Sequence, residues 1–273
     1  MKVFGLIGEK LGHSLSPEIH ENLYNKINMD AKFNLFSVVK SDISNVVSSI
    51  KTLGVKGCNV TIPYKETVME QLDFISDEAK KIGAINTILI KDGNSYGYNT
   101  DYYGFKRMLQ RDGVIFKDKV FYILGSGGAS KAIVHCLLDE GATKLVMVSR
   151  DKNIAKEKFK GLSKMEFLNY EDLSEIDSAY AVVNTTPCGM YPSVDTTAID
   201  KKIFEKFEVA CDIVYNPEQT RFLKEAKDAG LKTVKGLYML VAQAMRAEEI
   251  WNDIVIDEKV EKEIFEKLSL RFK

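Results

Sequence analysis

The 273-residue chain has few residues of the kinds that build metal or disulfide sites. Its four cysteines, Cys58, Cys136, Cys188 and Cys211, are far apart and form no C-x-x-C pair. Its three histidines form no H-E-x-x-H motif. This spacing excludes the zinc-finger, zinc-protease and disulfide-scaffold classes, and we expect no metal site. Scattered cysteines of this kind are expected to be buried as small hydrophobic residues.

The chain also lacks a charge excess and a long apolar run. Lys and Arg number 38 against 39 Asp and Glu, and the net charge of −1 argues against nucleic-acid binding. No apolar run reaches the roughly 18 residues of a membrane-spanning helix. The apolar N-terminal stretch ends at Glu9, too early for a secretory signal. We therefore expect a cytoplasmic globular protein with no nucleic-acid or membrane partner.

What the sequence does contain is a regular alternation of strand and helix patterns. The predicted strands are Val3–Ile7, Phe33–Val39, Gly57–Val60, Thr87–Ile90, Val120–Leu124, Leu145–Ser149, Ala181–Asn184 and Val209–Ile213. The amphipathic stretches between them include Glu18–Ile27, Ile43–Leu53, Ser130–Leu138 and Thr220–Ala229. This alternation predicts an α/β fold with parallel sheets covered by helices on both faces.

The length slightly favours two domains over one. Residues 92–101 are rich in turn formers and predict a hairpin or loop, after which a connecting helix starts near Tyr103. Apolar residues from Leu237 to Trp251 recur at helical spacing and predict helices that return to the first domain. We predict a first domain of residues 1–102, joined by helices in 237–273, and a second domain of residues 103–236.

A glycine-rich motif in the second half has the context of a dinucleotide site. The predicted strand Val120–Leu124 leads directly into Gly125-Ser126-Gly127-Gly128-Ala129-Ser130, and a helix follows. Gly125 would allow the tight turn, and Gly127 would let backbone N–H groups approach a pyrophosphate. The sixth position of the G-x-G-x-x-G pattern is Ser130 rather than glycine or alanine, and a purely structural turn is the alternative interpretation.

The end of the next predicted strand should select between the two nicotinamide dinucleotides. An acidic residue there would bind the ribose hydroxyl of NAD, whereas an arginine accommodates the 2′-phosphate of NADP. The sequence is Ser149-Arg150-Asp151-Lys152, so Arg150 favours NADP. Asp151 would repel a phosphate, an effect that Lys152 and Lys156 would offset, and NAD stays an alternative cofactor.

Four polar clusters in the first half mostly follow predicted strands, where ligands bind in open α/β sheets. They are His13-Ser14-Leu15-Ser16-Pro17, Asn59-Val60-Thr61-Ile62-Pro63-Tyr64-Lys65, Asn86-Thr87 and Asn99-Thr100-Asp101. Hydroxyl and amide side chains suit a polyhydroxylated ligand, and Lys65 and Asp101 could move a proton. Taken singly, Ser16-Pro17 could be a helix N-cap, residues 99–101 a turn, and Lys65 a solvated surface lysine.

These motifs, in this order, identify the sequence as similar to the shikimate dehydrogenase family. The resemblance runs from about Gly8 to Trp251 and includes Gly83-Ala84-Ile85-Asn86-Thr87 and Val241-Ala242-Gln243-Ala244. It implies reversible reduction of 3-dehydroshikimate to shikimate with NADPH, in aromatic amino-acid biosynthesis. It also implies an N-terminal substrate domain and a Rossmann-type NADP-binding domain. The only protein–protein assembly that we consider is a homodimer of this chain.

The resemblance also implies a set of site residues. By it, the shikimate-binding residues are Ser14, Ser16, Asn59, Thr61, Lys65, Asn86, Asp101, Tyr215 and Gln243. The NADP-binding residues are Gly125, Ser126, Gly127, Gly128, Ala129, Ser149, Arg150, Asp151, Lys152, Ile213 and Gly236. The family commonly has Asn-Arg-Thr where this chain has Ser149-Arg150-Asp151, which retains the arginine but adds an acid.

Catalysis in this interpretation depends on Lys65 and Asp101. Lys65 would stabilise and protonate the oxygen that becomes charged as the ketone is reduced, and Asp101 would orient it. The alternatives are a broad-specificity quinate/shikimate dehydrogenase that uses NAD and a folate-linked or amino-acid dehydrogenase of the same plan. A non-enzymatic nucleotide-sensing module is a third, although it would not need Lys65 and Asp101 together.

Overall fold

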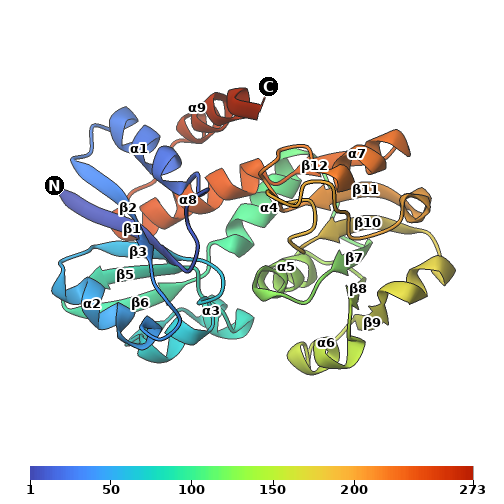
Figure 1. Cartoon of the computed structure of the whole chain (residues 1–273), viewed down its shortest axis with the longest axis horizontal. Helices are drawn as coiled ribbons and strands as arrows, with labels where there is room; N and C mark the ends of the chain where they lie inside the picture. Colours follow the sequence, from blue (N-terminus) through green and yellow to red (C-terminus); the bar gives the residue numbers. More distant parts are fainter. Residues whose placement is uncertain (273) are drawn as a thin grey trace. The chain divides into compact units, whose positions relative to one another are not determined.

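The structure is a computed structural model and describes residues 1–272, which divide into two compact units (Figure 1). Unit 1 comprises Met1–Gly104 and Val241–Arg271, and unit 2 comprises Phe105–Leu240 together with Phe272. The helices α4 (Asp101–Arg111) and α8 (Leu237–Asn252) each contribute residues to both units. Within residues 1–272, no helix is long and apolar enough to cross a membrane.

Unit 1 is built on a six-stranded sheet in the order β2-β1-β3-β5-β6-β4. Its strands are β1 (Lys2–Gly8), β2 (Ala31–Ser37), β3 (Gly57–Val60), β4 (Phe74–Ile75), β5 (Thr87–Lys91) and β6 (Asn94–Tyr98). The strand β1 pairs in parallel with β2 and β3, whereas β5 runs antiparallel to both β3 and β6. The prediction of purely parallel sheets is therefore wrong for this half of the chain.

The antiparallel pairing of β5 with β6 has a local cause. The hairpin or loop expected in residues 92–101 is a hairpin of β5 and β6, whose two central residues are Asp92 and Gly93. Both have positive φ, 52° and 77°. A two-residue turn of this kind matches the twist of paired strands, and an Asp-Gly sequence favours it. The chain thus reverses at once instead of crossing over through a helix.

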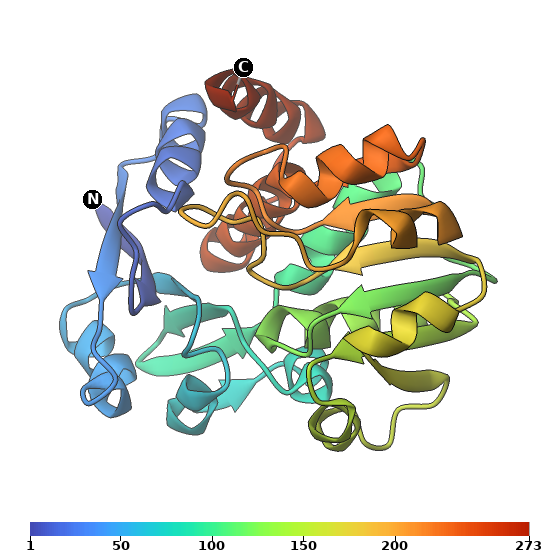
Figure 2. The same ribbon diagram turned by 45° about the vertical axis from the view of Figure 1, so that its right-hand side comes forward.

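Helices from both ends of the chain belong to this unit. They are α1 (Ser16–Lys26), α2 (Val46–Thr52), α3 (Asp77–Ile82), the unit 1 parts of α4 and α8, and α9 (Glu258–Ser269). The Trp251 ring of α8 stacks on Phe4 with ring centres 4.9 Å apart, and its indole N–H donates to the Ile88 carbonyl at 2.8 Å. The helix α9 lies beside α1, where Lys26 and Glu263 form a 2.5 Å ion pair (Figure 2).

Unit 2 contains a fully parallel six-stranded sheet in the order β12-β11-β10-β7-β8-β9. Its strands are β7 (Val120–Leu124), β8 (Lys144–Ser149), β9 (Met165–Asn169), β10 (Ala179–Asn184), β11 (Phe207–Asp212) and β12 (Lys232–Lys235). Its helices are α5 (Gly128–Asp139), α6 (Lys152–Lys158) and α7 (Arg221–Asp228). The strand order reverses between β7 and β10, which is the arrangement of a doubly wound dinucleotide-binding fold. The predicted α/β class is confirmed.

Candidate active site

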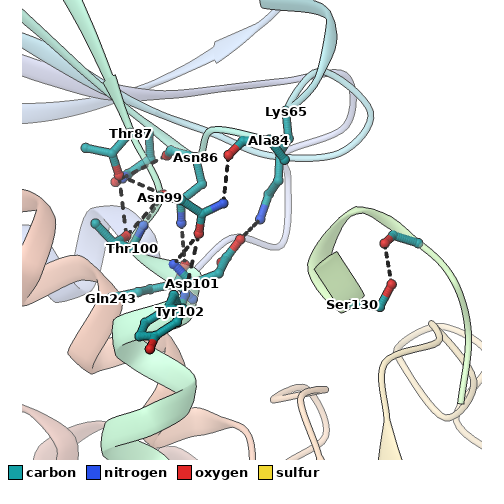
Figure 3. Close-up of polar contacts among 12 residues, drawn as sticks. Lys65, Ala84, Asn86, Thr87, Asn99, Thr100, Asp101, Tyr102, Ser130 and Gln243 are labelled. Carbon is teal, nitrogen blue, oxygen red and sulfur yellow. Dashed lines mark hydrogen bonds and ion pairs between the residues drawn. The ribbon is translucent and has the colours of Figure 1, made fainter. Parts of the chain in front are cut away.

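A lysine and an aspartate from separate segments of unit 1 form an ion pair. Lys65 lies in the loop after β3, and Asp101 is the first residue of α4. The Lys65 ammonium donates to Asp101 Oδ2 at 2.5 Å (Figure 3). The lysine side chain is 12% exposed and the aspartate side chain 4%. A charged hydrogen bond this well shielded holds its geometry far better than a surface pair does.

The loop that carries Lys65 is anchored on both sides of the side chain. The neighbouring Tyr64 is buried, and its hydroxyl donates to the Val38 carbonyl at 2.7 Å. The carbonyl of Lys65 accepts from the backbone N–H of Ile85 at 2.9 Å. These contacts fix the backbone from which the ammonium extends. The 12% exposure of the side chain excludes the interpretation of Lys65 as a solvated surface lysine.

The helix that carries Asp101 is fixed at its start by Asn99. The Asn99 side-chain oxygen accepts the backbone N–H groups of Asp101 and Tyr102 at 3.1 and 3.4 Å. Its amide nitrogen donates to the Ala84 carbonyl at 2.9 Å. Such side-chain capping satisfies N–H groups that a helix leaves without intrahelical partners. The capping ties Asp101 to the segment that precedes β5.

Asn86 connects the remaining polar residues of this region (Figure 3). Its side-chain oxygen accepts from the backbone N–H of Thr100 at 2.7 Å and from the Thr87 hydroxyl at 3.0 Å, and its nitrogen donates to Gln243 at 3.2 Å. Asn59 donates to the Thr87 hydroxyl at 3.1 Å. Asn86 is 3% exposed, so its amide serves mainly to hold Asn59, Gln243 and the start of α4 in register.

Ser14, just before α1, and Ser16, the first residue of α1, are in contact with each other. The Ser14 hydroxyl donates to the Ser16 hydroxyl at 3.1 Å and accepts from the Ser16 backbone N–H at 3.2 Å. The helix begins at Ser16, and Leu15 occupies the N-cap position without a side-chain cap. The interpretation of Ser16 as an N-cap is therefore wrong. Both serines are half-buried, as is Thr61 in the loop after β3.

The glycine turn of unit 2, which begins at Gly125, directly follows β7, one of the two strands between which the strand order reverses. Gly125 has φ of +94°, and a Cβ there would lie 2.7 Å from the Thr186 side chain, so only glycine fits. The Thr185 hydroxyl closes the turn against the carbonyls of Leu124 and Gly125 at 2.7 and 2.9 Å. By contrast, a Cβ built on Gly127 meets nothing within 4 Å.

This open space beside Gly127 and Gly128 suits a pyrophosphate, because a phosphate can approach the backbone N–H groups there. The helix α5 begins at Gly128, and its first turn directs partial positive charge toward the same space. The predicted Gly125–Ala129 segment therefore has the local form that a dinucleotide requires. Ser130, the irregular sixth position of the motif, is buried and donates its hydroxyl to the Gly127 carbonyl at 2.6 Å.

Asp151, which lies between β8 and α6, has a structural role as a helix cap. Its carboxylate accepts the backbone N–H groups of Asn153 and Ile154 at 2.9 and 3.1 Å, which makes it the N-cap of α6. Ser149 donates its hydroxyl to the Asp151 carbonyl at 2.7 Å. Lys152, expected to offset the Asp151 charge, instead pairs with Asp172 at 3.4 Å. Arg150, between these residues, is exposed.

Two further predicted residues of unit 2 are in direct contact. A Cβ on Gly236 would lie 2.5 Å from the Ile213 carbonyl oxygen, so the glycine permits the two backbones to touch. Tyr215, two residues after Ile213, is half-buried.

In unit 1, hydrogen bonds thus link Asn59, Asn86 and Gln243 to the start of α4, where Asp101 pairs with Lys65. The Ser14–Ser16 pair and Thr61 form separate parts of the predicted set. The structure groups the predicted residues of unit 2 around the glycine turn, the end of β8 and the end of β11.

A buried polar cluster at the ends of β10 and β11 was missed by the sequence analysis. The Asp212 carboxylate accepts from Asn184 at 3.0 Å, from the backbone N–H of Val214 at 3.0 Å and from the Thr220 hydroxyl at 2.6 Å. Burial raises the pKa of Asp212 to about 7, against the lowering effect of these three donors. Polar residues at the ends of two predicted strands were the available signal. Thr87, Asn99 and Thr100 were noted in clusters but not named as site residues.

The parallel sheet, its strand order and the open glycine turn place unit 2 in the class of dinucleotide-binding Rossmann domains. Comparison with known proteins then defines the family. The family model described as the shikimate dehydrogenase substrate binding domain matches residues 6–88. The chain is 59% identical to shikimate dehydrogenase (NADP(+)) of Clostridium perfringens (strain 13 / Type A), over the whole length of both chains.

Solved structures agree with this match. Shikimate dehydrogenase 1 from Peptoclostridium difficile superposes with a TM-score of 0.91 at 43% identity, covering 100% of this chain and 99% of that one. Shikimate 5-dehydrogenase from Thermus thermophilus, solved with NADP(H) and shikimate, has a TM-score of 0.86 at 30% identity over 98% and 99% of the two chains. This chain belongs to the shikimate dehydrogenase family, and the resemblance seen in its motifs is confirmed.

Proposed function

We propose that this chain catalyses the reversible reduction of 3-dehydroshikimate to shikimate with NADPH. The observation that carries the proposal is the shielded 2.5 Å ion pair of Lys65 and Asp101 among hydroxyl and amide side chains. The activity in the name of the Clostridium perfringens relative supports it. The substrate is a small molecule, and no partner macromolecule is needed for the chemistry.

We assign substrate binding to unit 1 and dinucleotide binding to unit 2. The match of residues 6–88 to a substrate-binding family model supports the first assignment, because these residues lie in unit 1. The glycine turn and the doubly wound sheet of unit 2 support the second. In this assignment the helices of the C-terminal segment serve the substrate unit, to which Gln243 belongs.

In the reducing direction, a hydride that bound NADPH supplies reaches the carbonyl carbon, and negative charge grows on the carbonyl oxygen. The Lys65 ammonium stabilises this charge and gives the oxygen its proton. Asp101 accepts a hydrogen bond from the ammonium and so keeps it aimed. In the oxidising direction, the Lys65 amine takes the proton from the substrate hydroxyl. The remaining 12% exposure lets Lys65 exchange that proton with water.

The other side chains of unit 1 would recognise the hydroxylated ring acid. Ser14, Ser16 and Thr61 offer hydroxyl groups, and Asn59 and Gln243 offer amides held in place by the Asn86 network. We further assign contacts with the substrate to Asn86, Asp101 and Tyr215. A ligand that leaves such buried groups unpaired is discriminated against by factors of about 10⁴.

The residues of unit 2 that would hold NADP are grouped at the carboxyl ends of its strands. The turn from Gly125 to Ala129 would bind the pyrophosphate, and Ser149–Lys152 the adenosine end, with Arg150 toward the 2′-phosphate. Ile213 and Gly236 would face the remainder of the cofactor. The open space beside Gly127 and Gly128 supports this assignment.

We also propose that the enzyme works in the cytoplasm as a homodimer and binds no nucleic acid. The net charge of −1 supports the last point. Light scattering coupled to size exclusion measures the oligomeric state, and a monomer at micromolar concentration would contradict the dimer.

The experiment that tests the function follows the absorbance of NADPH formed from shikimate and NADP+. Values of kcat/KM should be measured for shikimate and for quinate, each with NADP+ and with NAD+. We expect shikimate with NADP+ to give the highest value. A comparable value for quinate with NAD+ would instead establish the broad-specificity alternative, and no cofactor reduction with either acid would refute the proposal.

A further inference from the structure

One lysine of α6 reaches the glycine turn, although the sequence analysis assigned it no role. Lys158 is the last residue of α6, and its ammonium donates to the backbone carbonyl of Ser126 at 3.2 Å. Ser126 is the second residue of the glycine turn. The lysine therefore spans from the helix that follows β8 to the turn that follows β7.

The charge of Lys158 forms no ion pair with a carboxylate within residues 1–272. Its partner is a neutral carbonyl. Neighbouring lysines differ in this respect, because Lys152 pairs with Asp172 at 3.4 Å and Lys160 pairs with Glu157 at 3.3 Å. An ammonium has three N–H donors, so the bond to Ser126 leaves Lys158 able to bind an anion.

The acidic residue at the end of β8, Asp151, already has hydrogen-bond partners. Asp151 occupies the region where a NAD-binding protein uses a carboxylate to hold the ribose hydroxyls. Here its Oδ1 accepts two backbone N–H groups of α6, so the carboxylate faces the helix and its charge is partly neutralised. Arg150, immediately before it, is exposed. The balance of charge beside the glycine turn is thus positive.

We infer that Lys158 is a further cofactor-specificity residue, which binds the 2′-phosphate of the adenosine ribose together with Arg150. This inference rests on the proposed use of NADP by unit 2. The ligand it recognises is a phosphomonoester placed between the glycine turn and the end of β8. Lys158 supplies a second cation there. The carboxylate of Asp151 repels the phosphate less, because it accepts hydrogen bonds from two backbone N–H groups of α6.

The test measures binding rather than turnover. Isothermal titration calorimetry with 2′,5′-ADP and with 5′-AMP compares the full-length protein with its Lys158→Met variant. We expect the variant to bind 2′,5′-ADP about tenfold or more weakly, the usual loss for a hydrogen bond to a charged group, and 5′-AMP with little change. Lys158→Arg, which keeps a charged donor, should retain most of the affinity for 2′,5′-ADP.

Lys160→Met is the matched control. It removes the same charge two residues further along the chain, and Lys160 is already paired with Glu157. It should leave the affinity for both nucleotides unchanged. Equal loss of affinity for the two nucleotides in Lys158→Met would overturn the inference, as would no loss at all. If the protein binds 2′,5′-ADP as expected but does not oxidise shikimate, the proposed function fails and the phosphate site stands.

Discussion

At the residue scale, the central feature is the unequal setting of Lys65 and Asp101. Asp101 is the more buried of the two and sits at the start of a helix capped by Asn99. Lys65 extends from a loop and keeps some contact with solvent. A fixed carboxylate that directs a partly solvated ammonium is suited to repeated proton transfer, because the acid returns to the same position after each turnover.

Replacing Asp101 tests its orienting role. Asp101→Asn keeps a hydrogen-bond acceptor and removes the charge. We expect kcat for shikimate to fall by at least about tenfold, yet by less than the roughly 10²–10⁴-fold typical of losing the acid itself. Asp92→Asn, in the exposed β5–β6 turn, is the matched control. Steady-state kinetics measures both variants, and equal kcat values would show that Asp101 has no orienting role.

Asp212 provides a residue-scale prediction about pH. Its pKa is about 7 in the folded protein, whereas a free aspartic acid has a pKa near 3.9. Between these values the folded chain keeps a proton that the unfolded chain has lost. The contribution to stability is therefore fully present below about pH 4 and is lost as pH rises through about 7, a change of roughly 3–5 kcal/mol.

Asp212→Asn removes this titration and can keep the contacts, because the amide oxygen can accept from Asn184 and Val214 while the amide nitrogen donates to Thr220. Urea unfolding from pH 4 to 8 should show that the variant gains stability relative to wild type as pH rises. Parallel stability curves for the two proteins would contradict a raised pKa at Asp212.

Single residues also mark the limit of sequence reasoning. The pairing of Lys65 with Asp101 could be anticipated, because Lys65 follows a predicted strand and charged residues are rare in the polar clusters of the first half. The role of Asp151 could not, because an acid between an arginine and a lysine is equally compatible with repelling a phosphate and with capping a helix. The contact of Lys158 with Ser126 depends on the exact length of α6, which sequence patterns do not determine.

At the element scale, Gly125 and Gly127 of the turn after β7 have different surroundings. Gly125 has positive φ and no room for a side chain, whereas Gly127 has an ordinary φ of −81° and open space around it. The first glycine serves the fold, and in the proposed function the second permits the approach of a ligand.

Alanine substitutions should separate these tasks. Gly125→Ala should destabilise the protein by about 1–3 kcal/mol because of its backbone strain and its contact with Thr186. Gly127→Ala should cost less than about 1 kcal/mol, the scale of an N-cap change, yet weaken NADP+ binding by about tenfold or more. Thermal unfolding and calorimetric titration measure the two effects. Normal NADP+ affinity in Gly127→Ala would contradict the assigned pyrophosphate site.

The strands that sequence patterns missed share a physical reason. All eight predicted strands are present, with ends shifted by up to two residues. The missed ones are β4, β6, β9 and β12, and all but β6 lie at the edges of their sheets. An edge strand such as Lys232–Lys235 buries little apolar surface, so short polar sequences suffice and the pattern is weak. In β6, Ser95 and Gly97 face inward, and a hydrophobic pattern is absent.

At the scale of the whole molecule, each unit has its own sheet type and its own group of candidate residues. The alternation of strands and helices in the sequence predicts parallel sheets. This prediction describes unit 2 fully, but in unit 1 it describes only the pairing of β1, β2 and β3. The Asp92–Gly93 turn accounts for the antiparallel pairing of β5 with β6, where it replaces a helical crossover. Residues that act together were predictable where they follow strands, because strand ends of a parallel sheet gather at one edge.

The measurement that tests the account most directly is the turnover of Lys65→Ala. We predict that kcat for shikimate oxidation falls by roughly 10²–10⁴-fold, the scale of losing a general acid, while the dissociation constant of NADP+ stays essentially unchanged. Turnover near that of the unmodified protein would contradict the assignment of Lys65 as the proton donor and, with it, the proposed mechanism.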